Sequence, residues 1–149
     1  MRAEGRLELR ILTPSRMVFP TGPLAEAQVL AVRVPGALSP FEVLPRHAPI
    51  LSSLEIGEVR ITRGTWENPI YEYLAVAGGV VEVLHNRVIL LSPAVEWAHE
   101  IDVERAEAAR ERALNRLRHP TPETDLDRAQ AALMRALNRL KVAGHALEG

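Results

Sequence analysis

The first two thirds of the chain show the hydrophobic pattern of short β-strands. Apolar and polar residues alternate with the period of a half-buried strand at Leu7–Ile11, Val59–Ile61 and Val81–Val83. Short runs rich in Val, Ile, Leu or Tyr lie at Ala27–Val34, Ile70–Ala77 and Arg87–Leu91. Turn-forming residues separate these segments, and the pair Gly78-Gly79 is expected to form a tight turn between two strands. This pattern predicts an antiparallel β-sandwich or barrel.

The last third of the chain has the composition of two helices. Segments 102–118 and 125–143 contain no Gly or Pro, and Ala, Leu, Arg and Glu, all strong helix formers, dominate both. The linker 119–123 contains two prolines and is short, so the helices are expected to form an antiparallel hairpin. We therefore divide the chain into a sandwich domain, residues 1–93, and a hairpin domain, residues 94–149.

Local signals predict where these helices begin and end. Asp102 is expected to cap the first helix, and either Thr124 or Asp125 the second. Gly144 is expected to end the second helix. The hexapeptide Arg112–Leu117 is repeated without change as Arg135–Leu140, which indicates a duplication or matched packing of the two helices. Alanines at helical spacing in both copies would let the helix axes approach closely.

Composition and charge exclude several classes of protein. The 149 residues contain no cysteine, which excludes disulfides, cysteine-bound metals and thiol nucleophiles. The formal net charge of −1 is unlike that of a general nucleic-acid binder, so no nucleic-acid partner is expected. The longest apolar stretch, Leu74–Val81, is shorter than the roughly 20 residues that a spanning helix needs. Seventeen of the eighteen basic residues are arginine.

The hairpin arginines are candidates for binding an anion. Residues seven apart, such as Arg105 and Arg112, lie on one helix face about 10 Å apart. In an antiparallel hairpin, Arg105 approaches Arg139 and Arg112 approaches Arg135. Four guanidiniums can then face one anion, and the arginine fork suits phosphate because it binds two oxygens at once. The alternative is a solvated charged face paired with neighbouring glutamates.

Two other functions remain open at this point. One is a metal-dependent enzyme centred on His47 and His85, although no histidine pair has the spacing of a helical zinc motif. The other is a β-sandwich adaptor whose arginine-rich hairpin binds an acidic partner without nucleotide. Taken alone, the residues favour a binding or coupling module over an enzyme.

The order of several motifs resembles one known family, the epsilon subunits of bacterial F-type ATP synthases. The motifs are Val32–Gly36, Phe41–Leu51, Gly57–Ile61, Ala75–Val83, Asn86–Val88, Ile101–Ala106 and Arg135–Leu140. The resemblance implies a β-sandwich of about ten strands followed by an antiparallel helical hairpin. It also implies a non-catalytic rotor subunit of the central stalk, peripheral to the cytoplasmic face of the cell membrane and not inserted in it.

The same resemblance implies partners and a regulatory role. The sandwich would bind the gamma subunit and rest on the c-ring, through a crossing segment that includes Pro40, Glu42 and His47. Family members usually have glycine in place of Glu42 and Arg46, so a different loop conformation or contact is expected. The subunit would couple ion translocation to ATP synthesis, and its extended hairpin would reach the beta subunits and restrain ATP hydrolysis.

The resemblance further implies a regulatory ATP site and no obligatory cofactor. Some bacterial members bind ATP on the folded hairpin through an Ile-Asp-x-x-Arg-Ala motif, which is complete in this sequence. By the resemblance, the site residues are Glu96, Ile101, Asp102, Arg105, Ala106, Arg112, Arg135 and Arg139.

Overall fold

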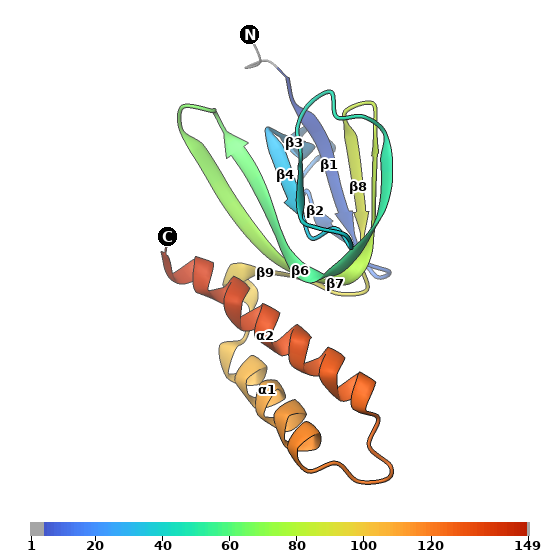
Figure 1. Ribbon diagram of the computed structural model, residues 1–149. Coiled ribbons are helices and arrows are strands. Elements are labelled where there is room, and N and C mark those ends of the chain that lie inside the picture. The colour runs from blue at the N-terminus through green and yellow to red at the C-terminus, as the bar shows by residue number, and fades with distance from the viewer. Residues whose placement is uncertain (1–4, 149) are drawn as a thin grey trace.

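A computed structural model describes residues 5–148. The elements in chain order are β1 (Leu7–Leu12), β2 (Met17–Phe19), η1 (Leu24–Ala27), β3 (Gln28–Val29), β4 (Ala31–Val34), β5 (Phe41–Val43), β6 (Ile50–Gly64), β7 (Pro69–Leu84), β8 (Arg87–Leu91), β9 (Val95–Trp97), η2 (Ala98–Glu100), α1 (Val103–Arg118) and α2 (Leu126–Glu148). A β-sandwich is followed by two antiparallel helices, which confirms the predicted fold class (Figure 1).

The nine strands form one curled sheet. The main order is β2-β1-β8-β7-β6-β4-β5, while β3 pairs with β1 and β9 pairs with β7. The β1–β8 pair is parallel, and the other pairs are antiparallel. Strands β6 and β7 have 15 and 16 residues, and they bend around the end of the sandwich nearest the helices (Figure 1). These two strands therefore contribute to both layers.

The alternating pattern places one face of each strand in the core. In β1, Leu7, Leu9 and Ile11 are fully buried, while the residues between them are partly exposed. In β8, Val88 and Leu90 are buried in the same way. The core is almost entirely aliphatic, and Phe19 and Trp97 supply its aromatic rings. Burial of this apolar face is the main force that holds the sandwich together.

The prediction of a turn at Gly78-Gly79 is wrong. Both glycines lie inside the continuous strand β7, where Leu54 pairs with Gly79 and Ile56 with Ala77. Glu55 and Gly78 fall between these two pairs, so the register has an irregularity there. The glycines have φ values of +80° and +117°, and a Cβ on Gly79 would lie 1.9 Å from the carbonyl oxygen of Leu91. The glycine pair marks a bend and a close approach, not a chain reversal.

The predicted helices are confirmed, with one error at an end. The Asp102 carboxylate accepts a hydrogen bond from the backbone N–H of Arg105 at 3.1 Å, and Asp125 accepts one from Arg128 at 3.0 Å. Both aspartates are therefore N-caps. The predicted stop at Gly144 is wrong, because α2 continues to Glu148. Packing of this last segment against the sandwich stabilises it as helix despite the glycine.

Small residues let the two helices approach each other closely. Ala106 and Ala113 of α1 and Ala129 and Ala136 of α2 are at most 2% exposed. They occupy equivalent places in the two copies of the repeat, which confirms the matched packing. No helix within residues 5–148 is long and apolar enough to cross a membrane.

A small apolar cluster joins the hairpin to the sandwich. Ala75 of β7, Ala98 of η2 and Ile101 pack against Val142 and Ala143 of α2, and Tyr73 covers the edge of the cluster. Strand β9 leads into this joint and pairs with β7. The C-terminal half of α2 thus lies on the sandwich, while the linker end of the hairpin points away from it (Figure 1).

Candidate functional site

Four arginines of the hairpin line one cleft. Arg112 and Arg116 come from α1, and Arg135 and Arg139 come from α2. We call this site the arginine cleft; it has a volume of about 350 Å³. Its remaining lining residues are Glu96, Ala109, Ala132 and Ala136. The alanines leave room for the cleft between the helices, and the guanidiniums give it a strongly positive character.

One of these guanidiniums is neutralised by a carboxylate of β9, the strand that precedes the helices. Arg139 Nε donates to Glu96 Oε1 at 2.6 Å, and its Nη2 donates to Glu96 Oε2 at 3.1 Å. The pair is bidentate and half-buried, which is the strongest geometry for an arginine–carboxylate contact. It joins α2 to β9, so it contributes both to the cleft and to the docking of the hairpin.

The other three arginines of the cleft have no ion pair in the part of the chain that the structure describes. Arg112, Arg116 and Arg135 are exposed to solvent. By contrast, Arg110 of α1, which does not line the cleft, contacts Glu111 at 3.4 Å. Arg139 of the cleft thus follows the alternative of pairing with a glutamate, and the other three cleft arginines are solvated without an ion pair among the described residues. Three unpaired positive charges that converge on one cleft fit an anionic ligand with several oxygens.

The arginine cleft continues toward the linker of the hairpin. A second cleft of about 620 Å³ shares Arg116, Ala132 and Arg135 with it and adds Arg128. Threonine and acidic side chains of the linker, Thr121, Glu123, Thr124 and Asp125, complete its lining. The two clefts together form an elongated basic groove along the hairpin.

The residues of the Ile-Asp-x-x-Arg-Ala motif lie around the start of α1. Ile101 is buried in the joint cluster, Asp102 caps the helix, and Ala106 is fully buried. Arg105 is exposed, and it is not among the residues that line the arginine cleft. The structure thus brings Glu96, Arg112, Arg135 and Arg139 together, while the motif residues hold the adjoining helix in place.

Pro40, Glu42 and His47 of the crossing segment each contact different parts of the molecule. Pro40 lines a cleft of about 520 Å³ that also includes Asn138 and Lys141 of α2. Glu42 forms an ion pair with Arg60 at 3.1 Å. The ring of His47 lies 6.2 Å from that of Phe41.

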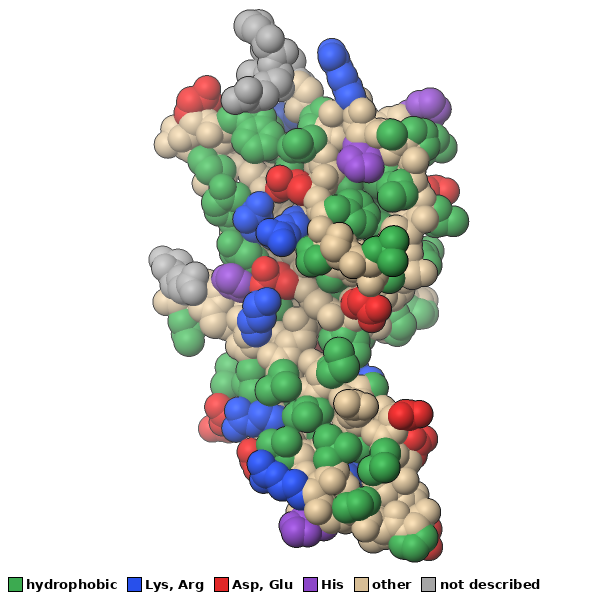
Figure 2. Space-filling model, in the orientation of Figure 1, with side chains coloured by type: hydrophobic (Ala, Val, Ile, Leu, Met, Phe, Trp, Pro, Cys, Tyr) green, Lys and Arg blue, Asp and Glu red, His purple; other side chains and the backbone are tan. Residues whose placement is uncertain are grey.

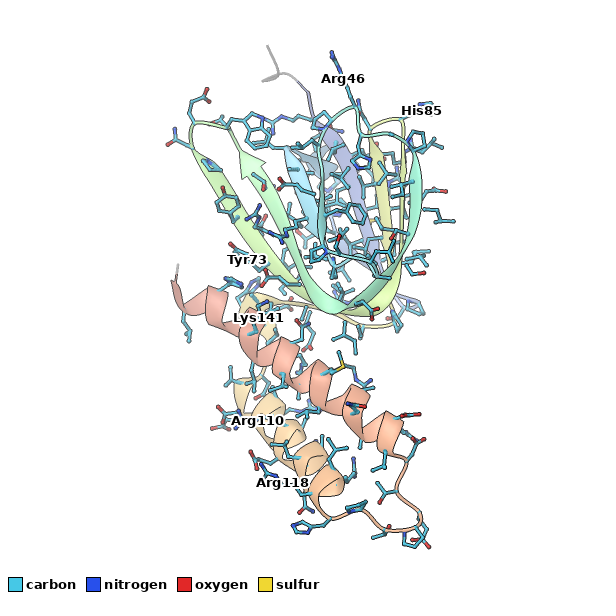
Figure 3. All side chains as sticks on the ribbon, viewed as in Figure 1. Arg46, Tyr73, His85, Arg110, Arg118 and Lys141 are labelled. Carbon is cyan, nitrogen blue, oxygen red and sulfur yellow. The ribbon has the colours of Figure 1, made fainter. Side chains whose placement is uncertain are left out.

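Arg46 has a left-handed backbone with φ of +69°, which a glycine would adopt without strain. Its backbone N–H donates to Asn86 Oδ1 at 2.7 Å, which ties the segment to the β7–β8 turn. Arg46 and His85 lie at the end of the sandwich opposite the hairpin (Figure 3). The left-handed turn is thus present in this chain with arginine in the place of glycine.

The metal-enzyme alternative has no site among residues 5–148. That part of the chain contains no group of three His, Cys, Asp or Glu side chains that could hold a metal ion. His47 Nδ1 lies 2.7 Å from the carbonyl oxygen of Ala48, and His85 lies in a turn where it and Asn86 both have positive φ. His85 thus belongs to the tight turn between β7 and β8.

Two contributors to the groove were not assigned from the sequence. Arg116 lies four residues after Arg112, and it occupies in α1 the place that Arg139 occupies in α2. The internal repeat was therefore a signal that could have added Arg116. Arg128 is the repeat partner of Arg105, which the sequence analysis assigned to the site, so the same signal could have added it, although Arg105 itself lines neither cleft.

Two family models match consecutive parts of the chain. The model for the β-sandwich domain of the ATP synthase delta/epsilon chain matches residues 6–98, and that for its long α-helix domain matches residues 99–144. The chain belongs to the ATP synthase delta/epsilon chain family. This assignment makes it a non-catalytic ATP synthase subunit, as the resemblance implied.

Curated relatives in bacteria carry the name ATP synthase epsilon chain. The chain is 45% identical over 112 residues to that of Syntrophobacter fumaroxidans, covering 75% of this chain and 76% of the relative. It is 44% identical over 118 residues to that of Carboxydothermus hydrogenoformans, covering 78% and 80%. The resemblance to bacterial epsilon chains is thereby confirmed.

Solved structures confirm the fold of this epsilon-type chain. A chain of the Euglena gracilis mitochondrial ATP synthase, from a structure of its OSCP, F1 and c-ring, has a TM-score of 0.74 at 17% identity. The match covers 100% of this chain and 85% of that one. A chain from the central stalk and c-ring of the Tetrahymena thermophila enzyme has a TM-score of 0.54 at 15% identity, covering 94% and 95%.

Proposed function

We propose that this chain is a regulatory rotor subunit of the central stalk in a bacterial ATP synthase, at the cytoplasmic face of the cell membrane. Its sandwich binds the gamma subunit and rests on the c-ring, and Pro40, Glu42 and His47 belong to the contacting segment. Its hairpin docks on the sandwich in one state and extends toward the beta subunits in the other. The extended hairpin restrains ATP hydrolysis. Family membership supports this proposal, as does the fact that the similar solved chains come from structures of ATP synthase assemblies that include the central stalk or the c-ring.

The arginine cleft carries the nucleotide part of the proposal. Three unpaired guanidiniums, from Arg112, Arg116 and Arg135, converge on it beside the Arg139–Glu96 pair. The triphosphate of ATP supplies several anionic oxygens for these groups. The cleft volume lies at the lower end of the range that is usual for small-molecule sites, and the adjoining groove extends it. The cleft needs both helices and β9, so it is complete only when the hairpin is docked.

This dependence on docking makes ATP a regulator. A ligand that binds only the docked state stabilises that state by RT ln(1 + [ATP]/Kd). At high ATP concentration the hairpin stays docked and hydrolysis is unrestrained. At low ATP concentration the released hairpin extends and restrains hydrolysis, which protects a scarce nucleotide pool.

Isothermal titration of the full chain with ATP tests the nucleotide site. We expect saturable binding, and we expect Arg112→Ala to weaken it by about tenfold or more because a charged hydrogen-bond partner is lost. Arg118→Ala is the matched control: this arginine belongs to the same helix but does not line the cleft (Figure 3). No heat at millimolar ATP, or equal losses in the two variants, would exclude the arginine cleft as the site. In that case the hairpin arginines would serve an acidic partner without nucleotide.

A further inference from the structure

The C-terminal end of α2 makes a polar contact with the sandwich that lies outside the arginine cleft. His145 Nε2 lies 2.6 Å from Glu58 Oε1 of β6. The imidazole also stacks on the ring of Tyr73 in β7, with centroids 3.7 Å apart and planes 6° from parallel. The side chains of His145 and Glu58 are 22% and 23% exposed, so the contact is largely withdrawn from water.

This contact connects three elements at the edge of the joint. Tyr73 lies beside the C-terminal part of α2, near Lys141 (Figure 3). A histidine and acidic and basic side chains gather on the surface where α2 meets the sandwich (Figure 2). Besides Glu58, the charged or titratable groups near His145 include Arg60 of β6, which pairs with Tyr73, and Tyr71, Glu72 and Tyr73 of β7, His99 of η2 and Lys141 of α2. Glu58 is the carboxylate that touches the imidazole.

We infer that Glu58, Tyr73 and His145 form a pH-sensitive latch, in which protonation of His145 strengthens the docking of the hairpin. The inference deepens the proposed function, because it rests on the movement of the hairpin, but it does not depend on nucleotide.

Histidine is the side chain whose charge ordinarily changes between pH 5 and pH 8. A neutral imidazole with its proton on Nε2 donates a hydrogen bond to the Glu58 carboxylate, whereas in an imidazolium the same hydrogen bond joins two opposite charges and is stronger. When the hairpin is released, the same imidazolium loses the carboxylate partner and the stacking ring. Because the partner exists only in the docked state, protonation and docking favour each other. The docked population therefore rises as the pH falls.

The test measures docking directly in the full chain. Because the chain has no cysteine, Glu82→Cys on the sandwich and Gln130→Cys on α2 provide two unique labelling sites, both exposed. Energy transfer between dyes on these sites reports the distance between the two units. Urea is set at the concentration that releases half of the hairpins at about pH 8, where histidine is neutral. We expect the ratio of docked to released hairpin to rise about two- to fivefold between about pH 8 and about pH 6.

Three further variants identify the titrating group. His145→Gln keeps a hydrogen-bond donor without the titration, and Glu58→Gln removes the carboxylate; each is expected to abolish the pH dependence. His99→Gln removes the neighbouring histidine and is expected to leave it intact. A docking ratio that does not change with pH, or a pH dependence that persists in His145→Gln, overturns the latch.

A titration with ATP in the same labelled chain separates the latch from the nucleotide proposal. If ATP leaves the docked fraction unchanged while the pH dependence requires His145, the latch stands and the nucleotide site fails. If ATP raises the docked fraction while pH has no effect, the latch fails and the nucleotide site stands.

Discussion

At the scale of single residues, Gly79 tolerates a side chain less than any other described glycine. Its φ of +117° is one that other residues rarely adopt, and an added Cβ would lie 1.9 Å from a backbone oxygen of β8. The neighbouring Gly78 also has a positive φ, but a Cβ there would meet an oxygen only at 3.4 Å. The two glycines therefore differ in steric demand while they share a backbone constraint.

We expect Gly79→Ala to destabilise the sandwich by about 2 to 4 kcal/mol, because strain and a backbone clash add together. Gly78→Ala is expected to lower the free energy of unfolding by about 1 kcal/mol, because it is opposed mainly by the positive φ of the backbone. Urea unfolding measured by tryptophan fluorescence checks both values, with Gly144→Ala as a control in open space. Equal costs at positions 78 and 79 would contradict the close approach to β8.

The role of a residue could be predicted from the sequence where it depended on residues close by in the chain. The Asp102 cap needs only three following residues, and the structure confirms it. The Arg139–Glu96 pair joins residues 43 positions apart, so no spacing rule could reveal it. Only the family resemblance placed both in one site. The His145–Glu58 contact spans 87 positions and carried neither kind of signal.

At the scale of the elements, the two copies of the hexapeptide have different surroundings. In α2, Asn138 Nδ2 donates to the carbonyl oxygen of Gly57 in β6 at 2.8 Å. The equivalent Asn115 of α1 is exposed, and its side chain has no hydrogen bond to another described residue. The repeat therefore supplies an internal comparison between a docked copy and a solvated one.

This comparison yields a paired prediction for docking. Asn138→Ala is expected to weaken the docking of the hairpin by about 1 kcal/mol, the usual net value of a hydrogen bond. Asn115→Ala is expected to leave docking unchanged, because it alters the same residue type in the same hexapeptide away from the joint. The labelled chain used for the latch measures both. A loss of docking in Asn115→Ala of equal size would show that the substitution acts through helix stability.

Errors at the element scale came from long-range context. The expected turn at Gly78-Gly79 fell inside a strand because β6 pairs with β7 on both sides of the glycines, and Leu91 of β8 lies so close to Gly79 that no side chain fits there. The expected stop at Gly144 failed because Val142 and Ala143 are buried against the sandwich, which holds the last turns helical. In both cases the local preference of glycine was outweighed by contacts with residues distant in sequence.

At the scale of the whole molecule, the hairpin and the sandwich meet through a limited joint. One small apolar cluster, the Arg139–Glu96 pair, the Asn138 hydrogen bond and the His145 contact are the main interactions between them. The sandwich has a far larger core of its own. We therefore expect the hairpin to detach without unfolding the sheet, as the proposed regulation requires.

A truncation after Glu100 tests the regulatory role at this scale. It retains β9, which pairs with β7, so the sheet stays complete. In the assembled ATP synthase we expect this truncation to raise ATP hydrolysis at low ATP concentration by about fivefold or more, because the restraining element is gone. A complex with the full chain is the reference. Unaltered hydrolysis would exclude restraint by the hairpin.

The shape of the hairpin also has a mechanical consequence. The 16 residues of α1 extend for about 24 Å from the joint, and the linker at the far end lies well away from the sandwich (Figure 1). On an arm of that length, a rotation of about 20° at the joint moves the tip by about 8 Å. The contacts that hold α2 lie close to the joint. A force that a partner applies at the tip is therefore larger where it reaches these contacts. The work needed to break these contacts is unchanged, so a partner opens the joint only if it binds the released hairpin more tightly than the docked one by the full cost of opening.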